Sequence, residues 1–284
     1  MTRIRMRLQP RQAPISIRFS TRRRHDVTRR MKVRILGCGT SSGVPRIGND
    51  WGQCDPDNPR NLRSRASILV SLGGFRILVD TSPDMRMQLL DARVGEVDAV
   101  IWTHEHADHT HGLDDLRQIM HRRGAAVPCY ARHHVLDILK WRFTYAFAGN
   151  AGYPASVDPI DLLDHQSIGP VEVSAIEMPH GPIKASGLIF SDGAHRIAYA
   201  TDFSRFTDEM VDFFQGVDLF VIDALRRYPH PTHPHLAMTL EGLAKVGHPR
   251  AIITHMDNTM DYADLVAELP SGVEPGYDGL EVQL

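Results

Sequence analysis

A short histidine-rich segment carries the residue types that bind transition metals. Residues 103–112 read Thr-His-Glu-His-Ala-Asp-His-Thr-His-Gly, which places His104, His106, Asp108 and His109 within six positions. In extended backbone, side chains two positions apart point to the same side, so His104 and His106 can converge on one ion. Asp108 and His109 follow where the chain turns and can reach a second ion. Imidazole and carboxylate at this density suit Zn²⁺, Mn²⁺ or iron rather than the oxygen shell of Ca²⁺.

Three further ligand-type residues each end an apolar stretch. His180 follows residues 171–178, Asp202 follows 197–201, and His255 follows 251–254. Folds that alternate strands and helices gather their sites at the carboxyl ends of strands. Taken singly, each residue could be an ordinary hydrogen-bonded loop residue. Together with the histidine-rich segment, they predict one site.

The elements that must position these residues follow from the apolar patterning. We expect strands at 33–36, 67–72, 75–79, 97–103, 171–176, 187–191, 196–201, 219–222 and 251–254. We expect helices at 85–93, 113–122, 134–147, 205–214, 240–246 and 262–269. Because both hairpin-linked and helix-separated strands occur, the sheets should be mixed and covered by helices. No linker or repeat interrupts residues 31–284, which predicts one domain.

The net charge of −2 over 284 residues hides an uneven distribution. Residues 1–30 hold ten arginines and one acidic residue, whereas residues 31–284 hold 22 basic and 33 acidic residues. We interpret residues 1–30 as a basic, disordered leader ahead of a start-like Met31; a transit peptide or a nucleic-acid arm also fits this composition.

No apolar run approaches the roughly 18 residues of a membrane span. Three scattered cysteines suggest neither disulfides nor a zinc knuckle, which predicts a cytoplasmic protein.

In their order along the chain, these residues resemble the ligand pattern of the metallo-β-lactamase fold hydrolases. The resemblance covers residues 31–284 and implies an α+β fold, an αββα sandwich of two mixed β-sheets flanked by helices. It implies two divalent ions: His104, His106 and His180 on one, Asp108, His109 and His255 on the other, and Asp202 bridging both. Asp80 matches the acidic residue that supports metal-bound imidazoles from behind.

Finer motifs are similar to the cyclic-phosphate phosphodiesterases related to the phosphonate-utilisation enzyme, which are themselves similar to the tRNA 3′-processing nucleases. The matching segments are 37–45, 80–84, 222–226, 230–233 and 269–279. The resemblance implies a hydrolase acting on a small phosphodiester, either a cyclic ribosyl phosphate or a nucleotide. In one departure, Cys54 stands alone where the phosphonate enzyme has a cysteine cluster, and Asn258 replaces that cluster's histidine. We therefore expect no structural zinc cluster.

The charge of the implied centre fits a phosphate ester. Two Zn²⁺ or Mn²⁺ ions carry +4, and Asp108, Asp202 and a bridging hydroxide reduce this to about +1. Such a centre attracts phosphate and supplies hydroxide as the nucleophile. The leaving alkoxide needs a proton, for which His233 aligns with the family's catalytic histidine and His235 is the rival if the loop shifts register. We count Asp108, His233 and His235 as the candidate catalytic residues.

Arginines near the site loops are candidates for phosphate contacts, because guanidinium forks match phosphate oxygens. The three candidates are Arg65, Arg226 and Arg227, with solvated surface arginines as the alternative.

The main alternative function is a tRNA 3′-processing-type endoribonuclease. Such an enzyme needs a basic exosite, because phosphate affinity comes from lysine and arginine. Residues 134–184 contain only Lys140, Arg142 and Lys184 as basic side chains. We therefore expect a small phosphodiester as the partner, with no membrane and no stable nucleic-acid binding. A homodimer, another hydrolase of the same fold, an iron dioxygenase and a structural metal-binding protein stay open.

Overall fold

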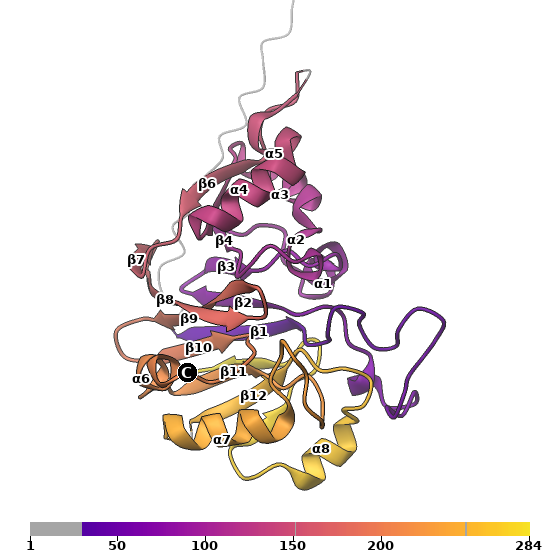
Figure 1. The fold of residues 1–284 in the computed structure, drawn as a ribbon. Helices are drawn as coiled ribbons and strands as arrows, with labels where there is room; N and C mark the ends of the chain where they lie inside the picture. The colour runs from indigo at the N-terminus through magenta and orange to yellow at the C-terminus, as the bar shows by residue number, and fades with distance from the viewer. Residues whose placement is uncertain (1–29, 151, 248) are drawn as a thin grey trace, which may run out of the picture.

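Two mixed sheets of seven strands each form the centre of the molecule (Figure 1). The computed structural model describes residues 30–150, 152–247 and 249–284; the expected leader lies outside the described residues except for Arg30. The first sheet has the order β14 (Glu281–Gln283), β1 (Met31–Gly37), β2 (Ser67–Leu72), β3 (Phe75–Val79), β4 (Ala99–Ile101), β5 (Val127–Ala131) and β6 (Val157–Asp161). The second has the order β13 (Val273–Pro275), β12 (Arg250–Thr254), β11 (Leu219–Asp223), β10 (Arg196–Ala200), β9 (Ile183–Ser191), β8 (Val171–His180) and β7 (His165–Ile168).

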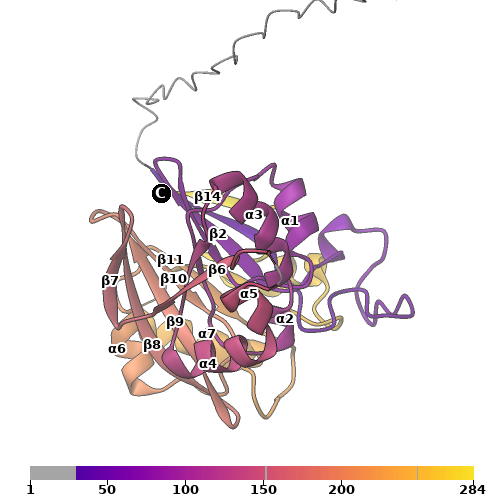
Figure 2. The ribbon, with the colours of Figure 1, turned by 90° about the horizontal axis from the view of Figure 1, so that it is seen from above.

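Helices cover the outer faces of both sheets (Figures 1 and 2). Their bounds are α1 (Met85–Asp91), α2 (Ala107–Thr110), α3 (Leu116–Arg123), α4 (His133–Arg142), α5 (Thr144–Ala148), α6 (Asp208–Phe214), α7 (Leu236–Val246) and α8 (Tyr262–Glu268). Helices α1, α3, α4 and α5 pack on the first sheet, and α6, α7 and α8 on the second. This is the αββα sandwich that the resemblance implied. No described helix has both the length and the apolar character that a membrane crossing needs.

Alternating side chains divide the apolar interior into two clusters. On β2, Ile68 and Val70 join the larger cluster between the sheets, while Leu69 joins the smaller one under α1, α3 and α4. Successive side chains of a strand point to opposite faces, so β2 contributes to both clusters. Strand β11 is buried along its whole length. The most apolar strands therefore lie inside each sheet. Because these strands are packed on both faces, their ends have fixed positions.

Strand direction brings the site residues to one edge. Strands β3 and β4 are parallel in the first sheet, and β10, β11 and β12 are parallel in the second. Strand β8 runs antiparallel to β9, which in turn runs antiparallel to β10, so β8 and β10 point the same way. The carboxyl ends of these strands therefore gather at one edge of each sheet.

Several expected elements differ from the structure. The helix expected over 134–147 is two helices, because Phe143 leaves helical geometry (φ −122°, ψ 39°) between α4 and α5. Helix α6 begins at Asp208, three residues later than expected, because the Thr207 side chain caps it by accepting from Met210 N. The expectation missed β5, β6, β7, β13 and β14. Strands β6 and β7 are largely polar edge strands, and β6 carries Pro159, a residue that edge strands tolerate.

Candidate metal centre

Acidic and histidine side chains end the strands at the shared edge. They are Asp80 after β3, His104 after β4, His180 in β8, Asp202 after β10, Asp223 in β11 and His255 after β12. Asp80, Asp202 and His255 have left-handed backbone, with φ of 64°, 60° and 58°. This conformation costs about 1–3 kcal/mol for a residue other than glycine and recurs at functional sites. The chain therefore turns sharply at the edge and directs these side chains inward.

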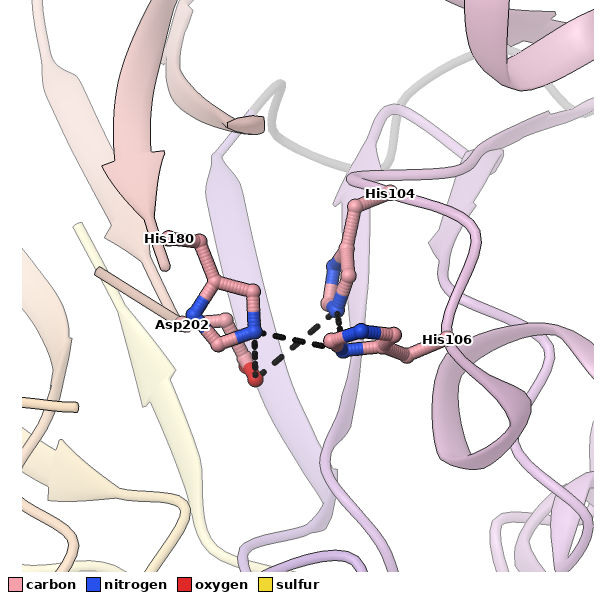
Figure 3. Close-up of side chains that lie close together, drawn as sticks. All are labelled: His104, His106, His180 and Asp202. Carbon is pink, nitrogen blue, oxygen red and sulfur yellow. Dashed lines mark hydrogen bonds and ion pairs between the residues drawn. The ribbon is translucent and has the colours of Figure 1, made fainter. Parts of the chain in front are cut away.

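The first ligand set combines three histidines with one oxygen of Asp202 (Figure 3). His106 Nδ1 lies 3.0 Å from His104 Nε2 and 3.2 Å from His180 Nε2. Asp202 Oδ1 lies 3.8 Å from His104 Nε2 and 3.6 Å from His180 Nε2. Ligand atoms of a tetrahedral zinc site lie roughly 3.3–3.4 Å from one another, given metal–nitrogen distances of about 2.0–2.1 Å. The observed distances bracket that spacing.

The second ligand set uses the other oxygen of Asp202. His109 Nε2 lies 3.2 Å from Asp202 Oδ2 and 3.3 Å from Asp108 Oδ2. His255 Nε2 lies 3.5 Å from each of these two oxygens. Asp202 thus presents Oδ1 to one set and Oδ2 to the other, which is the arrangement of a bridging carboxylate. Asp108, expected where the chain turns, lies in the first turn of α2.

Protein acceptors fix the orientation of three histidines. His109 Nδ1 donates to Asp80 Oδ2 at 2.8 Å, and His180 Nδ1 donates to the carbonyl oxygen of Thr232 at 2.9 Å. His104 Nδ1 lies 3.0 Å from the Thr103 hydroxyl, which donates to Asp80. Since each Nδ1 carries the proton, each Nε2 presents a lone pair to the ligand sets. Asp80 therefore orients His109 directly and His104 through Thr103.

The electrostatics of the site favour positive charge. Burial opposes protonation of His109, but Asp202, Asp108 and Asp80 outweigh it and raise the pKa of His109 well above its usual range. Burial also opposes the charge on His255, yet Asp202 and Asp223 raise its pKa to about 9. In contrast, burial lowers the pKa of His104 well below its usual range. Buried carboxylates are stabilised by cations that they contact.

Two buried histidine nitrogens without hydrogen-bond partners indicate whether the site suits a metal ion. Nε2 of His109 and of His255 are buried without a hydrogen-bond partner among the described groups. When these imidazoles are unprotonated, nitrogen and oxygen lone pairs converge on the same two points, and a proton or a bound cation offsets their repulsion. Imidazole and carboxylate together suit borderline divalent ions such as zinc. The residues present therefore fit divalent metal ions.

His233 lies beside the ligand sets, paired with a residue whose role the sequence did not reveal. Its Nδ1 is 3.0 Å from Asp223 Oδ2 and 3.7 Å from Asp202 Oδ1. Its ring stacks on His255, with centroids 4.9 Å apart and planes 12° apart. Asp223 Oδ2 also accepts from the backbone nitrogen of Asp202 at 3.0 Å. Asp223 ends an apolar strand as His180 does, and that position was the signal available in the sequence.

The rival histidine and the candidate arginines have other surroundings. His235 directly precedes α7, and its Nδ1 is buried without a hydrogen-bond partner among the described groups. Arg65 pairs with Asp84 at 3.1 Å, and Nη1 of Arg227 lies 2.5 and 2.6 Å from the two carboxylate oxygens of Glu268. Arg226 donates to the carbonyl oxygens of Tyr228 and Pro229. The guanidinium groups of these three arginines are thus engaged by other partners.

Comparison with known proteins gives a consistent picture. Residues 75–256 match the family model of the β-lactamase superfamily domain. The chain is similar to a crystallised diphosphatase of the PhnP family, with a TM-score of 0.82 and 33% identity over 90% of this chain and 97% of that one. It has the fold of the short form of human tRNase Z, with a TM-score of 0.64 and 17% identity over 88% and 98% of the two chains.

A curated relative differs in length from this chain. An octanoyltransferase from Porphyromonas gingivalis is 34% identical over 262 residues, which cover 88% of this chain but 51% of that protein. The chain thus spans about half the length of this relative.

Proposed function

Because this chain belongs to the β-lactamase superfamily and is a hydrolase of the metallo-β-lactamase fold, we propose that it is a dinuclear-metal phosphodiesterase acting on a small phosphodiester. The observation that carries the proposal is the placement of Asp202, whose two carboxylate oxygens face two separate ligand sets. A single ion would need only one set of ligand atoms, whereas this site has two. Zinc and manganese are the ions that the donor atoms suit best.

Bound divalent ions would act as Lewis acids toward the phosphoryl oxygens. They would also lower the pKa of a bound water molecule to near neutrality. The chain's residues hold the ligand atoms in place before substrate arrives. Asp80 and Thr103 orient His109 and His104, and the Thr232 carbonyl orients His180. Preorganisation of this kind avoids the cost of rearranging polar groups during the reaction.

Hydrolysis joins the oxygen of water to phosphorus and breaks the scissile P–O bond, and the leaving oxygen takes a proton. We assign that proton to Nε2 of His233, since Asp223 holds the Nδ1 side of the ring. The contact with the Asp223 carboxylate fixes the orientation of the ring. The proton that water gives up restores His233 for the next turnover. A positioned histidine of this kind typically contributes about 10²–10⁴-fold to the rate.

A diphosphate diester is the second candidate substrate. The similar PhnP-family protein is described as a diphosphatase, and its identity of 33% with this chain favours related chemistry. Cleavage of a P–O–P linkage would use the same ligand sets and would demand less protonation, because phosphate is a better leaving group than an alkoxide. The tRNA-processing alternative rests on similarity of fold.

A substrate panel with metal-reconstituted protein tests the proposal. The substrates are bis(p-nitrophenyl) phosphate, a ribosyl cyclic phosphate, a dinucleoside diphosphate and a precursor tRNA. We expect turnover of the small diesters and little cleavage of the tRNA. Preferred cleavage of the dinucleoside diphosphate would establish the second candidate, and preferred cleavage of the tRNA would establish the nuclease. Absence of turnover on all four would contradict phosphoester hydrolysis.

A further inference from the structure

An indole side chain lies in solvent at the end of α4, close to the ligand sets. Trp141 is 80% exposed, more than any other large aromatic residue among the described residues. By contrast, Trp102 is fully buried and its Nε1 donates to Thr81 Oγ1. Indole is among the most apolar side chains and recurs where a partner covers it. Trp141 is therefore available to contact a ligand, and the cavity beside it decides whether it does.

Trp141 lines an open cavity of about 580 Å³ on the outer side of the segment that carries His106. The lining residues are His106, Ala107, His111, Trp141, Arg142 and Phe143. His106 also belongs to the first ligand set, so the cavity adjoins that set. Small-molecule sites commonly have volumes of about 300–1,000 Å³. The cavity has room for an organic group attached to the phosphate.

The walls of the cavity combine aromatic faces with a positive charge. His111 meets Phe143 edge to face, with ring centroids 5.5 Å apart and planes 80° apart. The Arg142 guanidinium donates from Nη1 to the carbonyl oxygen of Glu105, within the ligand segment. This bond ties the end of α4 to the loop that carries His104 and His106. The guanidinium charge of Arg142 therefore lies beside the segment that carries His104 and His106.

We propose that this cavity is a nucleobase subsite in which the base of a nucleoside phosphodiester stacks on Trp141. The inference rests on the proposed function and names the substrate class: a nucleotide rather than a ribosyl phosphate without a base. Every base has a π face, and stacking on an aromatic side chain supplies affinity without reading base identity. Arg142 provides the matching charge for the phosphate next to the base. The subsite therefore selects for a base but discriminates little between bases.

The first test compares two substrates that differ only by the base. They are adenosine 2′,3′-cyclic phosphate and 1-O-methylribose 2,3-cyclic phosphate. In Trp141→Ala, the preference for the nucleotide, measured as the ratio of the two kcat/KM values, should fall about 10- to 100-fold. The fall should come from KM for the nucleotide. Trp141→Phe should retain more of the preference, because it keeps a π face.

A matched control uses another exposed aromatic residue. Tyr153 is 67% exposed and lines a different cavity, so Tyr153→Ala should leave the preference unchanged. The proposal is overturned if Trp141→Ala lowers kcat/KM equally for both cyclic phosphates, or if the control lowers the preference as much.

The second test does not depend on hydrolysis. Adenosine titrated into the full-length protein should quench tryptophan fluorescence, and Trp141→Phe should abolish the quenching while Trp51 and Trp102 still emit. Quenching that depends on Trp141 supports the subsite even if none of the phosphoester substrates is hydrolysed. Failure of all those substrates would contradict the proposed function but not the subsite. Quenching that persists in Trp141→Phe, or no quenching in the parent protein, overturns the subsite.

Discussion

Two clusters of buried polar side chains lie at this end of the molecule, and they are built on opposite principles. In the candidate metal centre, nitrogen and oxygen acceptors face one another at 3.0–3.8 Å. In the second cluster, the buried guanidinium of Arg63 donates to acceptors around it. We call this second group the Arg63 cluster: Cys54, Asn61, Arg63, Asp257, Met260 and Asp261.

The Arg63 cluster joins two loops that are distant in the sequence. Arg63 donates from Nη2 to the Met260 carbonyl at 2.6 Å and from Nη1 to the Asp257 carbonyl at 3.3 Å. Asn61 Nδ2 donates to Asp261 Oδ2 at 2.6 Å. Most donors and acceptors here are matched, and buried polar groups that are matched stabilise a single conformation. Both terminal nitrogens of Arg63 thus find acceptors within the chain, and its Nε is the buried donor left without a partner among the described groups.

The contrast between the two clusters shows how a candidate metal site differs from a buried hydrogen-bond network. A structural cluster pairs donors with acceptors, whereas a metal centre gathers acceptors and leaves the cation to complete them. Arg63 also lies at the place where the departure from the phosphonate enzyme was noted, with Nη1 3.8 Å from Cys54 Sγ. A guanidinium at this place supports the prediction that no structural zinc cluster forms, and that prediction can be tested by metal analysis.

Replacing the shared carboxylate should produce the largest loss of turnover. Asn suits the left-handed backbone at position 202 and has the shape of Asp, so Asp202→Asn removes the charge with little change in the fold. Both ligand sets lose one anionic oxygen. We expect kcat/KM for a small phosphodiester to fall by more than about 10³-fold, beyond the 10–100-fold typical of residues that only orient a ligand. Metal content per chain should fall with it.

The same experiment can separate the two clusters. Asp261→Asn serves as the matched control, because Asp261 belongs to the Arg63 cluster and should not hold a catalytic ion. Retention of full turnover by Asp202→Asn, or an equal loss in Asp261→Asn, would refute the distinction between them.

Loss of the proposed proton donor should have the next largest effect. His233→Ala should lower kcat on an alkyl phosphodiester by about 10²–10⁴-fold while metal content stays unchanged. The defect should shrink on bis(p-nitrophenyl) phosphate, because p-nitrophenolate leaves without protonation. Steady-state kinetics on both substrates measure the difference.

His235→Ala is the control for that prediction, since it removes a histidine two residues away. If His235→Ala shows the leaving-group-dependent defect and His233→Ala does not, the roles are reversed. An equal loss on both substrates in His233→Ala would mean that His233 stabilises the phosphoryl oxygens instead.

Disrupting the Arg63 cluster should change stability rather than chemistry. Arg63→Met leaves the Met260 and Asp257 carbonyls without their buried donor, and each unsatisfied buried group costs about 1–3 kcal/mol. We expect the free energy of unfolding to fall by about 2–4 kcal/mol in chemical denaturation. Turnover per folded molecule should stay within about threefold of the parent. A loss of turnover as large as that of Asp202→Asn, in protein that remains folded, would place the Arg63 cluster in the reaction.

The sequence predicted which histidine and aspartate side chains come together better than it predicted their surroundings. His104, His106, His180, Asp202 and His255 were recognisable because each ligand type ends or follows an apolar strand, and strand ends are set by local patterning. Their convergence on two sets is a property of sheet order, which the family resemblance supplied.

The features that the sequence did not predict depend on tertiary contacts, which leave little signal in the local sequence. Asp223 directly follows the strand expected over 219–222, and its pairing with His233 arises only when the loop before α7 folds back. The break at Phe143 and the polar strand β6 are likewise imposed by packing against neighbouring elements. Arg226 and Arg227 were candidates by proximity in the sequence, which does not determine where a long side chain finds its partner.

The most direct test of the central claim is a crystal structure of the full-length protein reconstituted with Zn²⁺, with anomalous scattering used to locate the ions. We predict two zinc ions about 3.5–4 Å apart, bridged by Asp202. His104, His106 and His180 should bind one, and Asp108, His109 and His255 the other, at about 2.0–2.2 Å. A single ion, or an ion at Cys54 with the two ligand sets empty, would contradict the account.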